Sequence, residues 1–168
     1  MDLVMEQRTF SVLVNNEPGV LAKVVGLFTG RGYNISSLTV SEIDAANAVS
    51  RITICTKGTP QVLEQIKAQL DRVVPVHRVS DLTVSGPSVE RELALVKVAG
   101  QGEKRVEALR SAEIFGAKVV DSGLDHFTFE LTGKPSKVGA FVAIMQPLGL
   151  TELSRTGVAA LARGAHAL

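Results

Sequence analysis

Apolar positions along the chain follow two spacings that alternate. Between Thr9 and Val14 every second residue is apolar on one face, as in a strand, whereas from Val20 to Phe28 apolar residues recur at helical spacing. The first half continues in this way, and the predicted elements are a strand at 9–14, a helix at 19–31, strands at 35–42 and 49–56, a helix at 60–72 and a strand at 76–84. This order is βαββαβ.

The same order returns after the turn-forming residues 85–88. The second set of predicted elements is a strand at 92–99, a helix at 102–115, strands at 117–122 and 126–131, a helix at 135–145 and a strand at 148–155. We therefore predict an α+β protein of two ferredoxin-like units, with domains at 1–84 and 89–168 and a linker at 85–88. Each unit would have an antiparallel sheet with helices on one face.

The loop between the first strand and the first helix has the composition of an anion-binding helix start. Pro18 suits the first helical position, and Asn16 or Glu17 can lie near the cap. Gly19 has no Cβ to keep a ligand away. The amides predicted to face a small carboxylate at the positive end of the helix are those of Gly19, Val20 and Leu21. The alternative is an ordinary helix entry.

The end of the same helix carries a second candidate segment. Gly30 and Gly32 can end the helix in a left-handed cap. Asn34 then begins the next strand with a polar amide, where an apolar or β-branched residue would be usual. Its role is either turn chemistry or contact with a ligand.

Composition and charge exclude several classes of protein. The 168 residues are 45% hydrophobic and 21% charged, with a net charge of +1, so no basic surface indicates nucleic acid as a partner. No apolar run approaches the roughly 20 residues needed to cross a bilayer, and the N-terminus lacks the pattern of a signal peptide. We therefore expect a cytoplasmic protein. The single cysteine, Cys55, excludes an internal disulfide and is expected to be a packed thiol.

No catalytic or metal-binding pattern is visible in the sequence. The three histidines lie in different elements without metal spacing, and Gly100 and Gly102 lack the remaining residues of a phosphate-binding loop. Activity as an enzyme on its own is not expected, and neither is a metal or cofactor held by this chain. Because such small units leave a sheet face and an edge strand open, we expect at least a dimer, with ligand sites possible at its seam.

Several motifs together resemble a known family. The most specific are residues 16–21 (NEPGVL), 31–35 (RGYNI), 37–40 (SLTV), 89–98 (VERELALVKV) and 152–157 (ELSRTG). In this order and spacing they are similar to the small, regulatory subunits of acetolactate synthase (acetohydroxyacid synthase). The resemblance covers about residues 8–164 and implies an amino-acid-binding ACT domain followed by an ACT-like domain.

The resemblance implies a role in branched-chain amino acid biosynthesis. Such a subunit activates a separate large catalytic subunit and makes it sensitive to feedback inhibition by valine, sometimes by leucine or isoleucine. Carried over by motif, the valine-binding residues would be Asn16, Gly19, Val20 and Leu21 of one subunit and Asn34 and Ile35 of the other, at the seam of an ACT dimer. Thiamine diphosphate and magnesium would belong to the catalytic partner.

The surface that activates the partner is a separate hypothesis. We expect it near Arg31 and Tyr33, in the exposed part of the first domain. Two other functions stay open at this point. One is a stand-alone amino-acid sensor acting on another enzyme or on transcription, and the other is a small ferredoxin-like enzyme.

Overall fold

The fold was analysed in a computed structural model, which describes residues 4–168; the first three residues of the predicted first domain lie outside this range. The chain forms two compact units. The first comprises residues up to 89 together with 158–168, and the second comprises residues 90–157. Residues 158–168 were predicted to belong to the second domain, whereas they pack with the first unit.

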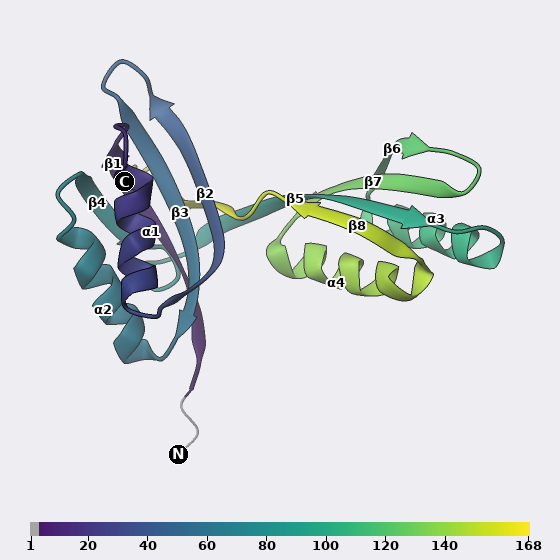
Figure 1. Cartoon of the computed structure of the whole chain (residues 1–168), viewed down its shortest axis with the longest axis horizontal. Coiled ribbons are helices and arrows are strands. Elements are labelled where there is room, and N and C mark those ends of the chain that lie inside the picture. The colour runs from purple at the N-terminus through teal and green to yellow at the C-terminus, as the bar shows by residue number, and fades with distance from the viewer. Residues whose placement is uncertain (1–3) are drawn as a thin grey trace. The chain divides into compact units, whose positions relative to one another are not determined.

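The first unit contains four strands and two helices in the predicted order (Figure 1). Their bounds are β1 Glu6–Asn15, α1 Val20–Gly30, β2 Asn34–Asp44, β3 Val49–Gly58, α2 Pro60–Asp71 and β4 Val76–Asp81. The sheet is antiparallel with the order β2-β3-β1-β4, so β2 and β4 are its edge strands. The predicted βαββαβ unit is confirmed.

The two helices cover one face of this sheet. The alternation of β1 directs Phe10, Val12 and Val14 toward the helices, where all three are fully buried. Val24 and Phe28 of α1 meet them in one apolar cluster. The helix α2 has Thr59 as its N-cap, with the Thr59 hydroxyl accepting from the Val62 amide.

The second unit repeats this arrangement (Figure 1). Its elements are β5 Ser88–Ala99, α3 Glu103–Phe115, β6 Lys118–Ser122, β7 His126–Gly133, α4 Pro135–Met145, the short 3-10 helix η1 Gln146–Leu148 and β8 Leu150–Arg155. The strands pair antiparallel in the order β6-β7-β5-β8. Phe129 and Phe141 lie at the centre of its core, with ring centroids 6.0 Å apart.

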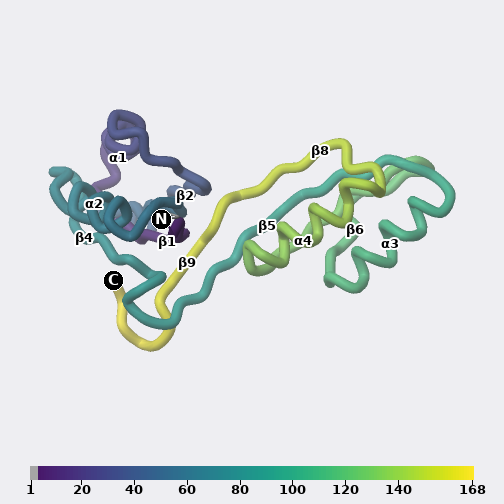
Figure 2. The backbone as a smooth tube through the Cα atoms, turned by 90° about the horizontal axis from the view of Figure 1, so that it is seen from below, coloured from purple at the N-terminus to yellow at the C-terminus, as the bar shows by residue number. Residues whose placement is uncertain are grey.

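One strand was not predicted. Ala159–Ala162 form β9, which pairs with β5 and also lies near β1 (Figure 2). Val158 and Ala160 form a small buried cluster with Cys55 and Leu82, so this segment covers part of the sheet face that the helices leave open. The thiol of Cys55 is buried, as expected. No helix within residues 4–168 is long and apolar enough to cross a membrane.

Candidate functional site

The candidate loop after β1 is fixed by backbone bonds to two neighbouring turns. The amide of Asn15 donates to the Pro75 carbonyl at 2.9 Å, and the amide of Asn16 donates to the Ala48 carbonyl at 2.6 Å. The His77 ring also contacts the side-chain oxygen of Asn15. The backbone of the loop is therefore held in place before any ligand is considered.

The start of α1 differs from the prediction. The helix begins at Val20, and Gly19 is its N-cap with φ 82°, a left-handed conformation that a residue inside a right-handed helix does not adopt. Pro18 therefore lies in the turn before the helix, and its expected place as the first helical residue was wrong. Within the described chain no side chain caps this helix, so neither Asn16 nor Glu17 is the cap.

The amides at this helix start are only partly available. The Val20 amide donates to the Glu17 carbonyl at 3.3 Å. The Val20 side chain belongs to the core, whereas Leu21 is 38% exposed. A Cβ added at Gly19 would meet no atom within 4 Å, so space lies open over this residue. The helix start offers an open backbone surface with an apolar side chain, Leu21, next to it.

Asn16 is oriented by a carboxylate that the sequence analysis missed. Its side-chain nitrogen donates to Oε2 of Glu42. A carboxylate only accepts, so the amide presents NH₂ to Glu42, and its carbonyl oxygen is left as the acceptor. Glu42 lies near the end of β2, opposite Ser50 of β3. Only the strand register brings it to Asn16, and no sequence motif could have indicated it.

The turn between β2 and β3 helps to hold the loop after β1 in place. Asp44 accepts from the backbone and side-chain nitrogens of Asn47, at 3.1 and 2.7 Å, and these hydrogen bonds lower the pKa of Asp44. Ala48 follows with φ 50°, and its carbonyl is the one that receives the Asn16 amide. The ionised Asp44 thus stabilises the turn that positions Asn16.

The end of α1 is confirmed as a left-handed glycine cap at Gly32, with φ 69°. The Gly32 amide donates to the Thr29 carbonyl and the Tyr33 amide to the Phe28 carbonyl, as in a Schellman motif. The rings of Phe28 and Tyr33 meet edge to face with centroids 6.1 Å apart. Gly30, the other predicted cap residue, is the last residue of the helix. Arg31 is exposed, whereas Tyr33 is partly buried and has a packing role.

Asn34 and Ile35 lie at the other end of the sheet from Asn16. Asn34 pairs with Lys57 of β3, whereas the last residue of β1, Asn15, pairs with Val49 of the same strand. These positions on β3 are eight residues apart (57 minus 49), which is about 26 Å along a strand. The Asn34 side chain is exposed and Ile35 packs against the core. One chain therefore does not bring the two predicted halves of the site together.

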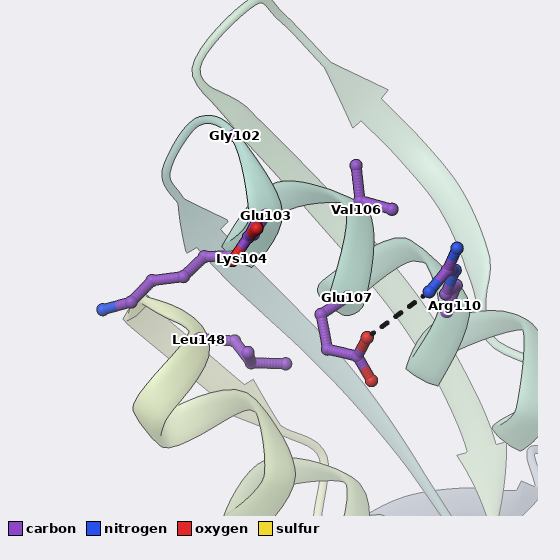
Figure 3. Close-up of a pocket in the computed structure, with 7 residues that line it drawn as sticks. All are labelled: Gly102, Glu103, Lys104, Val106, Glu107, Arg110 and Leu148. Atoms are coloured by element: carbon purple, nitrogen blue, oxygen red, sulfur yellow. Dashed lines mark ion pairs between the residues drawn. The ribbon is translucent and has the colours of Figure 1, made fainter.

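A separate hollow of about 730 Å³ lies in the second unit, beside the first turns of α3 (Figure 3). It is lined by Gly102, Glu103, Lys104, Val106, Glu107, Arg110 and Leu148. Glu107 and Arg110 are paired at 4.0 Å, and Lys104 extends away from them. The charges do not converge on a common point. Among residues 4–168 no group of three or more His, Cys, Asp or Glu residues is placed to hold a metal ion.

Comparisons with known proteins cover both units. The family described as an AHAS small subunit-like ACT domain matches residues 10–78, and the family described as the small subunit of acetolactate synthase matches residues 91–164. The chain is 46% identical to the probable acetolactate synthase small subunit of Archaeoglobus fulgidus, over 94% of this chain and 98% of that protein. It is 45% identical to the isozyme 3 small subunit of Escherichia coli, over 94% and 96%.

A solved structure has the same fold over nearly the whole chain. The acetolactate synthase small subunit of Thermotoga maritima matches with a TM-score of 0.83 and 38% identity, over 96% of this chain and 99% of that one. The similarity therefore extends over both units.

Proposed function

The chain belongs to the family of acetolactate synthase small subunits, and we propose that it activates a catalytic large subunit and confers feedback inhibition by valine. The observation that carries the proposal is the loop from Asn16 to Gly19. It combines a fixed backbone, a left-handed glycine and an oriented amide at one end of an ACT-type sheet.

A homodimer would complete the proposed site. The outer edge of β2 has no partner strand among the described residues, and it exposes Val40 and Ile43. If two β2 strands pair antiparallel across a two-fold axis, the start of each lies beside the end of the other. Asn34 and Ile35 of one copy would then approach Asn16 and Glu42 of the second copy. This geometry supports a site shared between two subunits.

The groups available suit a free branched-chain amino acid. Backbone amides near Gly19 would bind the carboxylate at the helix start, and the side-chain oxygens of Asn16 and Asn34 would accept from the ammonium. Leu21 and Ile35 would supply apolar contacts for the side chain. Because the ligand would touch both copies, binding would favour one dimer geometry over another, and such a difference is what feedback control requires.

The chemistry would belong to the partner. We propose that the catalytic large subunit holds thiamine diphosphate and magnesium and condenses two 2-oxo acids, and that this chain contributes no catalytic residue. The complex would act in the cytoplasm. The role proposed for this chain is therefore to change the activity of a second protein according to the supply of its end product.

Reconstitution with a large subunit tests this function. Adding the chain to the purified catalytic subunit should raise acetolactate formation, and valine should then lower it. Calorimetric titration of the chain alone should show binding of valine. At a valine concentration 100 times its dissociation constant, the native state gains about 2.7 kcal/mol, which should raise the thermal midpoint.

Two variants locate the ligand. Asn34→Ala should abolish the valine-dependent rise in midpoint, because it removes an acceptor for the ammonium. Gln101→Ala is the control, since this exposed residue lies in the second unit, in the loop between β5 and α3 that corresponds to the loop after β1. Loss of the response in both variants, or in neither, would contradict the proposed site.

Activation is tested apart from feedback. Arg31→Ala removes an exposed charge without disturbing the aromatic pair, so it is cleaner than any change of Tyr33. We expect weaker stimulation of the catalytic subunit with unchanged binding of valine. Full stimulation by this variant would place the activating surface elsewhere.

A further inference from the structure

The C-terminal segment that returns to the first unit makes specific contacts with the strand that carries half of the proposed site. We call residues 156–162 the C-terminal strap. The Val158 amide donates to the hydroxyl of Ser37 at 2.8 Å, and the hydroxyl of Thr39 donates to the Val158 carbonyl at 3.1 Å. The backbone amide and carbonyl of the buried Val158 are thus both hydrogen-bonded to β2, through the side chains of Ser37 and Thr39, two residues apart on that strand.

Apolar packing holds the strap on the open face of the sheet. Val158 is 4% exposed and Ala160 is 5% exposed, and both belong to one buried cluster with Cys55 and Leu82. Beyond β9, the Arg163 amide donates to the Pro87 carbonyl at 2.9 Å. The strap is therefore fixed at its middle and at its end, and its strand β9 also pairs with β5. Residues 158–162 of the strap belong to the first unit, whereas Thr156 and Gly157 belong to the second.

The contact lies next to an irregularity in β2. The pairing of β2 with β3 shifts between Ile35 and Ser37, so Ser36 has no partner across the ladder. A bulge interrupts the ladder locally, and Asn34 and Ile35, which keep their pairing with β3, lie on the far side of it. Ser37 is the first residue after the shift, and it is the residue that binds Val158.

We propose that the strap positions the ligand-binding end of β2 and couples it to the second unit. By holding Ser37 and Thr39, the strap fixes the strand directly after the bulge and thereby the placement of Asn34 and Ile35. Val158 follows Gly157 in the chain, and Gly157 ends the second unit. A change in β2 on binding an amino acid therefore passes along the strap to β8, whose last residue, Arg155, directly precedes the strap. The coupling rests on the proposed function, whereas the positioning does not.

The positioning is tested without any ligand. The double variant Ser37→Ala, Thr39→Val removes both hydroxyls that bind Val158 and keeps the size of the second side chain. Ser36→Ala, Ser41→Ala is the matched control, because both serines are exposed on the same strand. In hydrogen exchange of the full chain, the first variant should exchange about tenfold faster over residues 34–40 and 158–162, and the control should not. Equal rates in wild type and the first variant would overturn the positioning.

The coupling is tested by repeating the exchange with valine. In the wild type, valine should slow exchange over both 34–40 and 158–162. In the double variant, it should protect 34–40 alone, with an affinity reduced about fivefold by the loss of the two hydrogen bonds that order the strand. Protection of the strap as in the wild type would overturn the coupling. Absence of any valine effect in the wild type would contradict the proposed ligand and the coupling built on it, while the free-chain rates still decide the positioning.

A single substitution covers the case in which the double variant does not fold. Thr39→Val removes one of the two hydrogen bonds and leaves the Val158 amide paired with Ser37. It should accelerate exchange over the same two segments by a smaller factor. Unchanged rates in both segments would again overturn the positioning.

Discussion

The two units build the end of their first strand in the same way but equip it differently. In each unit, two backbone amides, that of the last residue of the first strand and that of the residue after it, donate to carbonyls in two turns. One turn precedes the last strand of the unit and the other precedes its third strand. These bonds join Asn15 to Pro75 and Asn16 to Ala48 in the first unit, and Ala99 to Gly149 and Gly100 to Asp125 in the second. Where the first unit has the oriented amide of Asn16, the second has a glycine without a side chain.

The strand that would carry the other half of a ligand site also differs. The strand β2 has 11 residues, whereas its counterpart β6 has 5. In the second unit, the residue that corresponds to Glu42 is Ser122, and no strand segment corresponds to Asn34 and Ile35. The backbone scaffold alone therefore does not make the site. The side chains at the two ends of the first unit's sheet distinguish this candidate ligand-binding unit from the second unit.

A third difference is a reversed ion pair. Arg8 and Glu92 occupy corresponding positions, each seven residues before the last residue of its strand, Asn15 or Ala99. Arg8 bonds to Asp81 at 3.1 Å, whereas Glu92 accepts two bonds from Arg155, at 2.8 and 2.7 Å. Both pairs join the first strand to the last with the charges exchanged, and Arg8 also pairs with Glu64 at 2.6 Å and with Glu6 at 3.3 Å.

The largest expected effect on stability concerns Gly149, the glycine directly before β8. A Cβ at Gly149 would lie 2.1 Å from the Ala99 carbonyl oxygen, and its φ is 106°. Gly149→Ala should therefore destabilise the second unit by about 4 kcal/mol, as expected when both a clash and backbone strain arise. Denaturation with urea would measure the loss.

Gly19→Ala is the matched control for this prediction. Its φ is 82°, yet no atom lies within 4 Å of the added Cβ. We expect a cost of about 1 to 2 kcal/mol, from the left-handed conformation alone. Equal losses for the two alanines would contradict the distinction between a glycine needed for close approach and one needed only for conformation.

The next largest effect concerns the reversed ion pair. Arg8→Ala should cost about 3 kcal/mol, because the buried Asp81 carboxylate loses its cation and keeps only the hydrogen bond from the Thr83 amide. Asp81 is 3% exposed, whereas Arg155 is 35% exposed and can reach water if Glu92 is lost. Glu92→Ala should accordingly cost about 1 kcal/mol. Chemical denaturation of both variants at neutral pH gives the two values, and a larger loss for Glu92→Ala would reverse this interpretation.

The sequence was sufficient for the features that depend on local periodicity. Alternation in β1 and β5 and the helical spacing of Val20, Val24 and Phe28 predicted two βαββαβ units, which the structure confirms. The cap at Gly32 was also predicted, because a glycine just after a helix readily adopts the left-handed conformation that ends it. The proposed ligand-binding residues stay a prediction, although the structure shows why one chain does not unite them.

Features that depend on register or on distant contacts could not be predicted. Pro18 followed by Gly19 fits both a helical start and a turn, and only the left-handed φ of Gly19 decides between them. Glu42 reaches Asn16 through strand pairing. The strap was missed because its small residues show no clear alternation and because Val158 and Ser37 are 121 residues apart in sequence. Such contacts have no signature in a local pattern.

The smallest expected effect concerns a histidine that the second unit has in place of a valine. His126 pairs with Ala99, as Val49 pairs with Asn15. Its ring contacts the carboxylates of Asp125 and Asp121, each at 3.0 Å, and these hydrogen bonds raise the pKa of His126 above 6.5. The charged imidazole is therefore favoured in the folded state.

The sign of the pH dependence follows from this shift. A raised pKa contributes stability that is fully present below 6.5 and is lost as the pH rises through the folded value. The midpoint of the transition of the second unit should fall slightly between pH 6 and pH 9, and His126→Val should remove the slope. His77→Gln, in the first unit, is the matched control and should leave it. Because both carboxylates are exposed and the ring is partly exposed to solvent, the slope should shrink with added salt. A slope that survives in His126→Val would assign the pH dependence to another group and remove this distinction between the two units.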